Sequence, residues 1–172
     1  MPGHVILSHG TDSGPGATKV SALARVAESL GWTTLRLDYR QDDAPGLARS
    51  VAPRVDRLVA ALRGAVRPLI LVGSSMGAFV SGLASLQAPC DGMFLIALPV
   101  EIPECPRFDA VRGVPGMLVH GYRDDLCPVG ASVAFARARA MPSLLVDDDH
   151  RLANHVALLE CAFGSFLKTV AA

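Results

Sequence analysis

The chain contains 172 residues, 51% of them hydrophobic, and its formal net charge is zero. This length is enough for one well-packed domain, so we expect residues 1–172 to form a single domain. A nucleic-acid partner requires a basic protein surface, and a chain without net positive charge does not indicate one. We therefore expect no nucleic-acid binding. The high apolar content excludes an intrinsically disordered chain and is typical of a globular one with much buried sheet.

The N-terminal sequence MPGHVILSHG has no basic region followed by an apolar stretch of signal-peptide length. The longest strongly apolar run, MFLIALPV, is far too short to span a bilayer, so we expect no membrane insertion. Cys90, Cys105, Cys127 and Cys161 have neither paired nor metal-like spacing. We therefore expect free thiols and a cytoplasmic location.

Short apolar runs alternate with helical patterns along the chain. Strands are expected at residues 5–8, 33–39, 68–73, 93–98, 116–121 and 143–148. Helices are expected at residues 20–30, 47–62, 76–86, 129–140 and 154–170. Runs such as PLILVG show no polar alternation, which is typical of strands buried on both faces. We predict an α/β fold of three layers, with a doubly wound, mostly parallel sheet of about six strands and helices on both faces.

The second of these helices has a clear amphipathic pattern. Its apolar residues, from Leu47 to Leu62, follow one another at steps of three and four. Four arginines fall at other positions of the pattern: Arg49, Arg54, Arg57 and Arg63.

A glycine-rich loop, SHGTDSGPGATK (residues 8–19), follows the first strand. Such a loop could cradle a phosphate or direct backbone N–H groups at an oxyanion. It lacks the glycine and hydroxyl that flank the lysine of a P-loop, and Lys19 stands where a dinucleotide fingerprint needs its third glycine. Gly14, Gly16 and Asp38 keep a nucleotide-binding alternative open.

The sequence GSSMG (residues 73–77) lies between an expected strand and an expected helix. A G-x-S-x-G motif in this context predicts a nucleophile elbow, in which the flanking glycines permit a sharp turn around the serine. Ser75 is centred between Gly73 and Gly77, whereas its neighbour Ser74 is not. Ser75 is therefore the candidate nucleophile.

A serine nucleophile needs a histidine base and an acid to orient it. Asp124 and Asp125 follow one expected strand, and His150 follows the next. The chain order Ser, Asp, His is the hydrolase order. Asp124 is favoured over Asp125, and His150 over His155, which is expected to lie on the last helix.

These motifs resemble the α/β-hydrolase superfamily, specifically a small lidless serine hydrolase. The resemblance covers about residues 5–167 and includes SHGTDSG as the oxyanion loop and GSSMG as the elbow. The family's acid loop, H-G-x-x-D-x-x-V-P, is similar to residues 120–128, with Cys127 in the usual valine position. The pair Asp149–His150 is similar to its histidine loop.

The resemblance implies roles for five residues. Ser75 would be the nucleophile, His150 the general base and then acid, and Asp124 the residue that orients His150. The backbone N–H groups of Thr11 and Met76 would form the oxyanion hole.

Two departures from the family bear on the substrate. The antiparallel strands that usually begin the sheet are missing, and the stretch between the strands at 93–98 and 116–121 is too short for a helical cap. We therefore expect an open site that does not suit a bulky buried lipid, with Asp12, Leu126 and residues 99–108 bordering its entrance.

The remaining histidines and the acidic run Asp147–Asp149 have simpler interpretations. His9 and His120 are expected to make structural hydrogen bonds, with an indirect supporting role open for His9, and His4 is expected to be solvated. Consecutive carboxylates of a strand alternate between its faces, so no metal site is predicted. The run either forms a solvated turn or raises the pKa of the histidine beside it.

The sequence therefore predicts a serine hydrolase that cleaves a small or medium acyl ester or thioester without a cofactor, as a monomer or homodimer. The alternatives are a thioesterase or acyl-peptide hydrolase and, from another class, a non-catalytic α/β-hydrolase-fold binding module. A complete Ser–Asp–His set separates the enzyme from the binding module, because fold alone does not determine function.

Overall fold

The computed structural model describes residues 2–171 and contains one six-stranded sheet. All strand pairs are parallel, in the order β2-β1-β3-β4-β5-β6. The strands are β1 (His4–Ser8), β2 (Thr33–Leu37), β3 (Leu69–Ser74), β4 (Gly92–Ile96), β5 (Gly116–Gly121) and β6 (Ser143–Val146). The predicted fold class is confirmed, and the sheet is entirely parallel.

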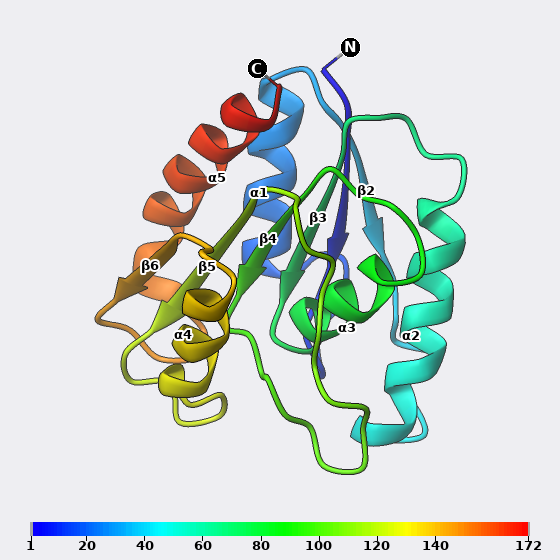
Figure 1. Cartoon of the computed structure of the whole chain (residues 1–172), viewed down its shortest axis with the longest axis vertical. Helices are drawn as coiled ribbons and strands as arrows, with labels where there is room; N and C mark the ends of the chain where they lie inside the picture. Colours follow the sequence, from blue (N-terminus) through cyan, green and yellow to red (C-terminus); the bar gives the residue numbers. More distant parts are fainter. Residues whose placement is uncertain (1, 172) are drawn as a thin grey trace.

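Helices cover both faces of this sheet (Figure 1). They are α1 (Thr18–Ser29), α2 (Leu47–Leu62), α3 (Met76–Ser85), α4 (Val129–Ala138) and α5 (Val156–Ala171), with a 3₁₀ turn, η1 (Ala153–His155), before α5. Helices α1 and α5 pack on one face, and α2, α3 and α4 pack on the other. Each connection returns the chain to the same end of the sheet, so all six strands run in the same direction.

The central strands are apolar along their whole length because each face lies under a helix layer. In β3, Leu69 and Leu71 point into the core beneath α2 and α3, whereas Ile70 and Val72 point into the core beneath α1 and α5. Every residue of β3 and β4 is buried. The edge strand β2 is largely exposed, so its sequence TTLRL tolerates polar residues.

Three strands are shorter than predicted, and β2 ends at Leu37 instead of residue 39. Strand β4 ends at Ile96 because Ala97 has a φ of 48°, which turns the chain out of the sheet. Strand β6 ends at Val146, where the N–H of Asp148 bonds back to the Val146 carbonyl. Asp147 and Asp148 therefore lie in a turn beyond the strand.

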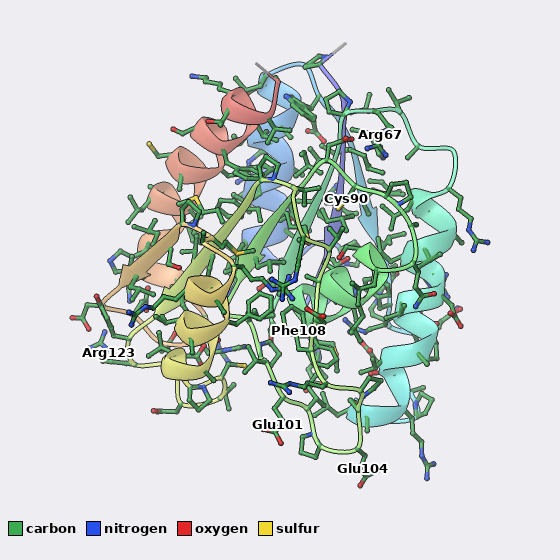
Figure 2. All side chains as sticks on the ribbon, in the orientation of Figure 1. Arg67, Cys90, Glu101, Glu104, Phe108 and Arg123 are labelled. Carbon is green, nitrogen blue, oxygen red and sulfur yellow. The ribbon has the colours of Figure 1, made fainter. Side chains whose placement is uncertain are left out.

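The segment between β4 and β5 carries no helix or strand from residue 97 to residue 115, so no lid covers the sheet. Phe108 fixes this segment to the core, since its ring packs against Phe79 and lies where a side chain at Gly82 would project. Figure 2 shows Glu101 and Glu104 at the outer tip of the segment. The expectation of a fold without a cap is confirmed.

Helix α2 departs from its predicted pattern at Leu47, which is exposed, and at Arg54. Arg54 is fully buried, although it falls outside the apolar series of that helix. It lies three residues after Val51 and four before Leu58, which places it on the inward face. Its charge is balanced there by Asp43.

Across residues 2–171, no helix combines the length and the apolar composition needed to cross a bilayer.

Candidate active site

The turn between β3 and α3 places Ser75 in a strained backbone conformation. Its φ is 55° and its ψ is −123°, values that L-residues rarely adopt. Side chains cannot replace the flanking glycines. A Cβ at Gly73 would lie 2.4 Å from the Gly77 carbonyl oxygen, and one at Gly77 would lie 2.1 Å from that of Ser8. The sharp turn therefore depends on close backbone packing, and it presents Ser75 at the carboxyl end of β3.

Three loops at this edge of the sheet bring Ser75, His150 and Asp124 together. The Oγ atom of Ser75 lies 2.9 Å from Nε2 of His150. The Nδ1 atom of His150 lies 2.8 Å from Oδ2 of Asp124. The three residues follow β3, β6 and β5, so the parallel sheet brings together side chains that are far apart in the chain.

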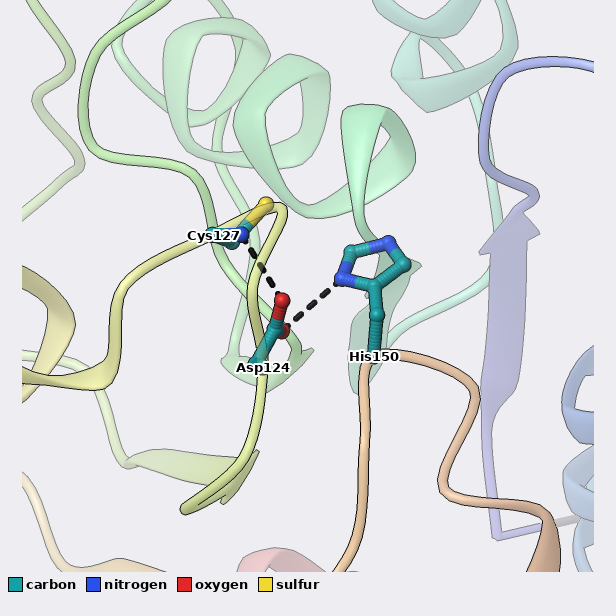
Figure 3. Close-up of side chains that lie close together, drawn as sticks. All are labelled: Asp124, Cys127 and His150. Carbon is teal, nitrogen blue, oxygen red and sulfur yellow. Dashed lines mark hydrogen bonds and ion pairs between the residues drawn. The ribbon is translucent and has the colours of Figure 1, made fainter.

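Asp124 is buried and held by several donors (Figure 3). The backbone N–H groups of Leu126 and Cys127 donate to its Oδ1 at 3.0 and 2.7 Å. Burial of the carboxyl favours its neutral form, but hydrogen bonds from His120, His150 and the Cys127 backbone outweigh burial and lower the pKa of Asp124 well below its usual range. The ionised carboxylate accepts the Nδ1 proton of His150, which leaves Nε2 unprotonated and facing Ser75.

The competing residues lie elsewhere. Asp125 is exposed. His155 lies in η1 rather than on the last helix, and its Nδ1 is 2.9 Å from Oδ2 of Asp148. Ser74 is the buried last residue of β3.

Asp148 organises the loop that carries His150. Its carboxylate bonds His155 and accepts the N–H groups of Asp149 at 2.9 Å and Asn154 at 2.9 Å. The hydrogen bond from His155 is the main cause that lowers the pKa of Asp148 to about 2. The interpretation of residues 147–149 as a solvated turn was wrong for Asp148, because its carboxylate is buried and fully hydrogen-bonded.

Two other histidines support neighbouring backbone, as predicted, and one does not behave as expected. His120 is buried, and its Nε2 donates to the Cys127 carbonyl at 2.7 Å and lies 3.1 Å from Oδ2 of Asp124. His9 bonds the Gly10 carbonyl at 2.7 Å. The prediction that His4 is solvated was wrong, because His4 lies half-buried in β1 with its Nδ1 2.7 Å from Thr33 Oγ1.

The loop of residues 9–13, which we call the oxyanion loop, passes directly beside Ser75. A Cβ added at Gly10 would lie 3.3 Å from Cβ of Ser75. Met76 begins α3, so its N–H has no partner within the helix. Within residues 2–171, neither the Thr11 N–H nor the Met76 N–H donates to another protein group. Thr11 lines the pocket that opens over Ser75, whereas the Met76 side chain is buried in the core.

A pocket of about 680 Å³ opens over Ser75 and His150. Asp12 and Leu126 both line it, and the Leu126 side chain is 75% exposed. Of the residues expected to border the entrance, Asp12 and Leu126 lie at this pocket, whereas residues 99–108 do not line it. A pocket of about 740 Å³ at the amino ends of β5 and β6 contains none of the candidate catalytic residues.

Lys19 also lines the pocket, and sequence reasoning gave it no role. Its Nζ donates to the carbonyl oxygens of His150 at 3.1 Å and Arg151 at 2.9 Å. Burial lowers the pKa of Lys19 to about 8, and the negative charges of nearby aspartates, Asp124 first among them, oppose this shift. The lysine thus ties the first turn of α1 to the loop that carries His150.

Within residues 2–171, one group of three potential metal ligands converges: the donor atoms of Asp124, Cys127 and His150 lie within 4.8 Å of one another. Nitrogen, sulfur and carboxylate donors would suit Zn²⁺. Burial raises the pKa of the Cys127 thiol to about 12, so it is a poor source of the thiolate that a metal binds.

Asp38, the candidate ribose ligand of the nucleotide alternative, is paired with Arg40 at 2.6 Å.

No protein-family model matches the chain, and no curated protein matches it. Among solved structures, a protein from Xanthomonas campestris pv. campestris assigned to the hydrolases of the alpha/beta superfamily is 42% identical. The match covers 97% of this chain and 99% of that one, with a TM-score of 0.93. The chain therefore belongs to the alpha/beta hydrolase superfamily.

More distant structures show the same fold. Est1E from Butyrivibrio proteoclasticus is 18% identical, with a TM-score of 0.76 over 98% of this chain and 88% of that one. Another Xanthomonas campestris protein, a member of the α/β serine hydrolases without lid, is also 18% identical, with a TM-score of 0.70 over 96% of this chain and 81% of that one. These likenesses agree with the absence of a cap between β4 and β5.

Proposed function

We propose that the protein is a serine hydrolase that cleaves carboxylic esters or thioesters of small to medium size through an acyl-enzyme intermediate. The observation that carries this proposal is the continuous chain of hydrogen bonds from Ser75 Oγ to His150 Nε2 and from His150 Nδ1 to Asp124. A binding module would have no need for a hydroxyl, an imidazole and a carboxylate in this order, and the relative that is 42% identical is assigned to the hydrolases of the superfamily.

In the proposed first step, Ser75 Oγ forms a bond to the acyl carbon while His150 Nε2 takes its proton. The carbonyl oxygen becomes an oxyanion that accepts hydrogen bonds from the N–H groups of Thr11 and Met76. Asp124 stabilises the imidazolium. When the tetrahedral intermediate collapses, the bond to the leaving group breaks and His150 returns the proton to the departing alcohol or thiol.

In the second step a water molecule attacks the acyl-enzyme. His150 again takes the proton, now from water, and then gives it to Ser75 Oγ as the ester bond to the enzyme breaks. The products are a carboxylic acid and the regenerated serine. Both steps need only the side chains of Ser75, His150 and Asp124 and the backbone N–H groups of Thr11 and Met76, and no cofactor takes part.

The shape of the site favours a modest substrate. The pocket of about 680 Å³ is large enough for a drug-sized molecule, and no lid encloses it. Est1E, a relative in fold, has been solved with ferulic acid bound. We therefore include esters of aromatic acids beside short aliphatic esters, with Asp12 and Leu126 at the entrance.

The direct test is hydrolysis of p-nitrophenyl esters of increasing acyl length by the purified protein. We expect turnover of the short esters, and loss of turnover in Ser75→Ala with the circular-dichroism spectrum unchanged. A Ser75→Ala variant as active as the wild type would exclude Ser75 as the nucleophile. Acyl-coenzyme A and acyl-peptide substrates, run in parallel, separate an esterase from a thioesterase or an acyl-peptide hydrolase.

A further inference from the structure

A fully buried cation lies beneath the oxyanion loop. The side chain of Arg54 on α2 has no exposed surface. Its Nη1 donates to the His9 carbonyl at 2.9 Å and its Nη2 to the Gly10 carbonyl at 3.3 Å. Its Nε and Nη2 also donate to the two carboxylate oxygens of Asp43, each at 2.6 Å. The Tyr39 ring covers the guanidinium, with the central carbon 4.7 Å from the ring centroid. A buried charge is costly unless it is paired, so this paired guanidinium is a rigid support.

The Gly10 carbonyl is the point on which these contacts converge. It accepts hydrogen bonds from His9 Nδ1 at 2.7 Å, Ser13 Oγ at 3.2 Å and Arg54 Nη2 at 3.3 Å. The Tyr39 N–H donates to His9 Nε2 at 3.0 Å, so the single proton of the neutral imidazole must be on Nδ1. That proton makes Nδ1 a donor to the Gly10 carbonyl. Three donors therefore fix the direction of one carbonyl group.

Fixing this carbonyl also fixes the next N–H. The peptide bond between Gly10 and Thr11 is planar, and in a trans peptide the C=O and N–H groups point in opposite directions. With the Gly10 carbonyl directed at Arg54, the Thr11 N–H points away from α2. Gly10 itself lies beside Ser75, where an added Cβ would be 3.3 Å from the Ser75 Cβ.

Hydrogen bonds in a chain also polarise one another. A cationic donor on the Gly10 carbonyl draws electron density from the peptide and makes the Thr11 N–H a stronger donor to an oxyanion. We infer that Arg54 is a positioning residue that orients and polarises the Gly10–Thr11 peptide of the oxyanion hole; this inference rests on the proposed hydrolase function.

The chain supplies a matched control one turn further along the same helix. Arg57 pairs with Asp42 through the same two-bond geometry, at 2.6 and 3.1 Å, but on the protein surface. The test compares Arg54→Lys with Arg57→Lys. It measures kcat and KM for a short p-nitrophenyl ester, together with the inhibition constant of an aryl trifluoromethyl ketone. The serine oxygen adds to the carbonyl carbon of this ketone as the histidine takes its proton, and the adduct carries a negative oxygen like that of the reaction intermediate.

For Arg54→Lys we expect kcat to fall about 10- to 100-fold, less than the roughly 10²–10³ lost when a whole oxyanion donor is removed. The ketone inhibition constant should rise by the same factor, while KM stays within about threefold. Arg57→Lys should match the wild type in all three. A purely structural role for Arg54 would reduce the fraction of active protein and leave the inhibition constant unchanged, and that result would overturn the inference.

Asp43→Asn provides a second variant if Arg54→Lys does not fold. It keeps the guanidinium and removes the charge that holds it, so we expect a smaller fall in kcat of about three- to tenfold, with a parallel rise in the ketone inhibition constant. Wild-type kcat and inhibition in Asp43→Asn, or in a folded Arg54→Lys, would contradict the inference.

A second readout does not depend on turnover. The amide nitrogen of a residue responds to hydrogen bonds on the preceding carbonyl, so the ¹⁵N resonance of Thr11 should shift in ligand-free Arg54→Lys and stay in place in Arg57→Lys. An unshifted Thr11 resonance would refute the positioning role. A wild-type protein that neither cleaves esters nor binds the ketone would instead refute the hydrolase proposal. In that case the shift of the Thr11 resonance in Arg54→Lys would still test whether Arg54 positions the Gly10–Thr11 peptide.

Discussion

The two sides of Ser75 are supported by opposite charges. Beneath the oxyanion loop lies the buried cation Arg54, whereas the loop that carries His150 is supported by the buried anions Asp124 and Asp148. Acyl transfer would create a negative oxygen on the first side and an imidazolium on the second. The guanidinium, itself paired with Asp43, and the two carboxylates thus lie on the sides where their charges would stabilise the two halves of the transition state, as expected of a preorganised site.

The largest effects are expected on the histidine side. His150→Ala should lower kcat by about 10⁴-fold or more, because no other group can take the Ser75 proton. His155→Ala should stay within about tenfold of the wild type, since His155 bonds Asp148 and not the serine. Steady-state hydrolysis of a short ester measures both, and the reverse order would assign the base to His155.

The second-largest effect is expected when the charge of Asp124, which orients His150, is removed. Asp124→Asn should lower kcat by about 10³- to 10⁴-fold, because the amide can donate to Nδ1 and so stabilises the wrong tautomer. Asp125→Asn, a neighbouring exposed carboxylate, is the control and should be unchanged. Equal losses in the two variants would show that the contact between Asp124 and His150 does not matter for turnover.

A smaller effect is expected when the hydrogen bonds between Lys19 on α1 and the loop that carries His150 are removed. Lys19→Met removes two hydrogen bonds to the carbonyls of that loop and should lower kcat about three- to tenfold through looser placement of the imidazole. Lys168→Met alters an exposed lysine in the last turn of α5 and should have no effect on kcat. Unchanged kcat in Lys19→Met would mean that Asp124 and Asp148 hold the loop without the lysine.

The smallest effect concerns stability in acid. The pKa of Asp148 in the folded protein is lowered to about 2, below the value of about 4 for an unfolded aspartate. Its ionised form therefore contributes stability that is fully present above about pH 4 and is lost as the pH falls through about 2. Thermal unfolding of Asp148→Asn should begin at a lower temperature than the wild type at pH 7, and this difference should shrink between about pH 4 and pH 2. A constant difference over that range would exclude a contribution from Asp148 ionisation.

Much of the fold could be predicted from the sequence because its strongest signals are local. The apolar runs of β3 and β4 indicated a covered parallel sheet, and the glycines around Ser75 indicated a sharp turn. Ser75, Asp124 and His150 each follow a strand, so the direction of a parallel sheet was enough to predict that they lie at one edge.

The supporting charges could not be predicted in this way because they depend on partners distant in sequence. Arg54 breaks the apolar pattern of α2, and its burial makes sense only once Asp43 and two loop carbonyls are seen beside it. Asp148 was assigned to the end of a strand that in fact ends at Val146, and the turn considered for residues 147–149 was a solvated one, not one organised by a buried carboxylate. Lys19 lacked any local motif.

The account depends most directly on Ser75 being the nucleophile. Reaction of the native protein with a fluorophosphonate, followed by mass spectrometry of the digested protein, identifies the modified residue. We predict a single adduct on Ser75, which is retained in Ser74→Ala and lost in Ser75→Ala and His150→Ala. An adduct on another residue would contradict the account. The absence of any adduct on the folded native protein would contradict it as well.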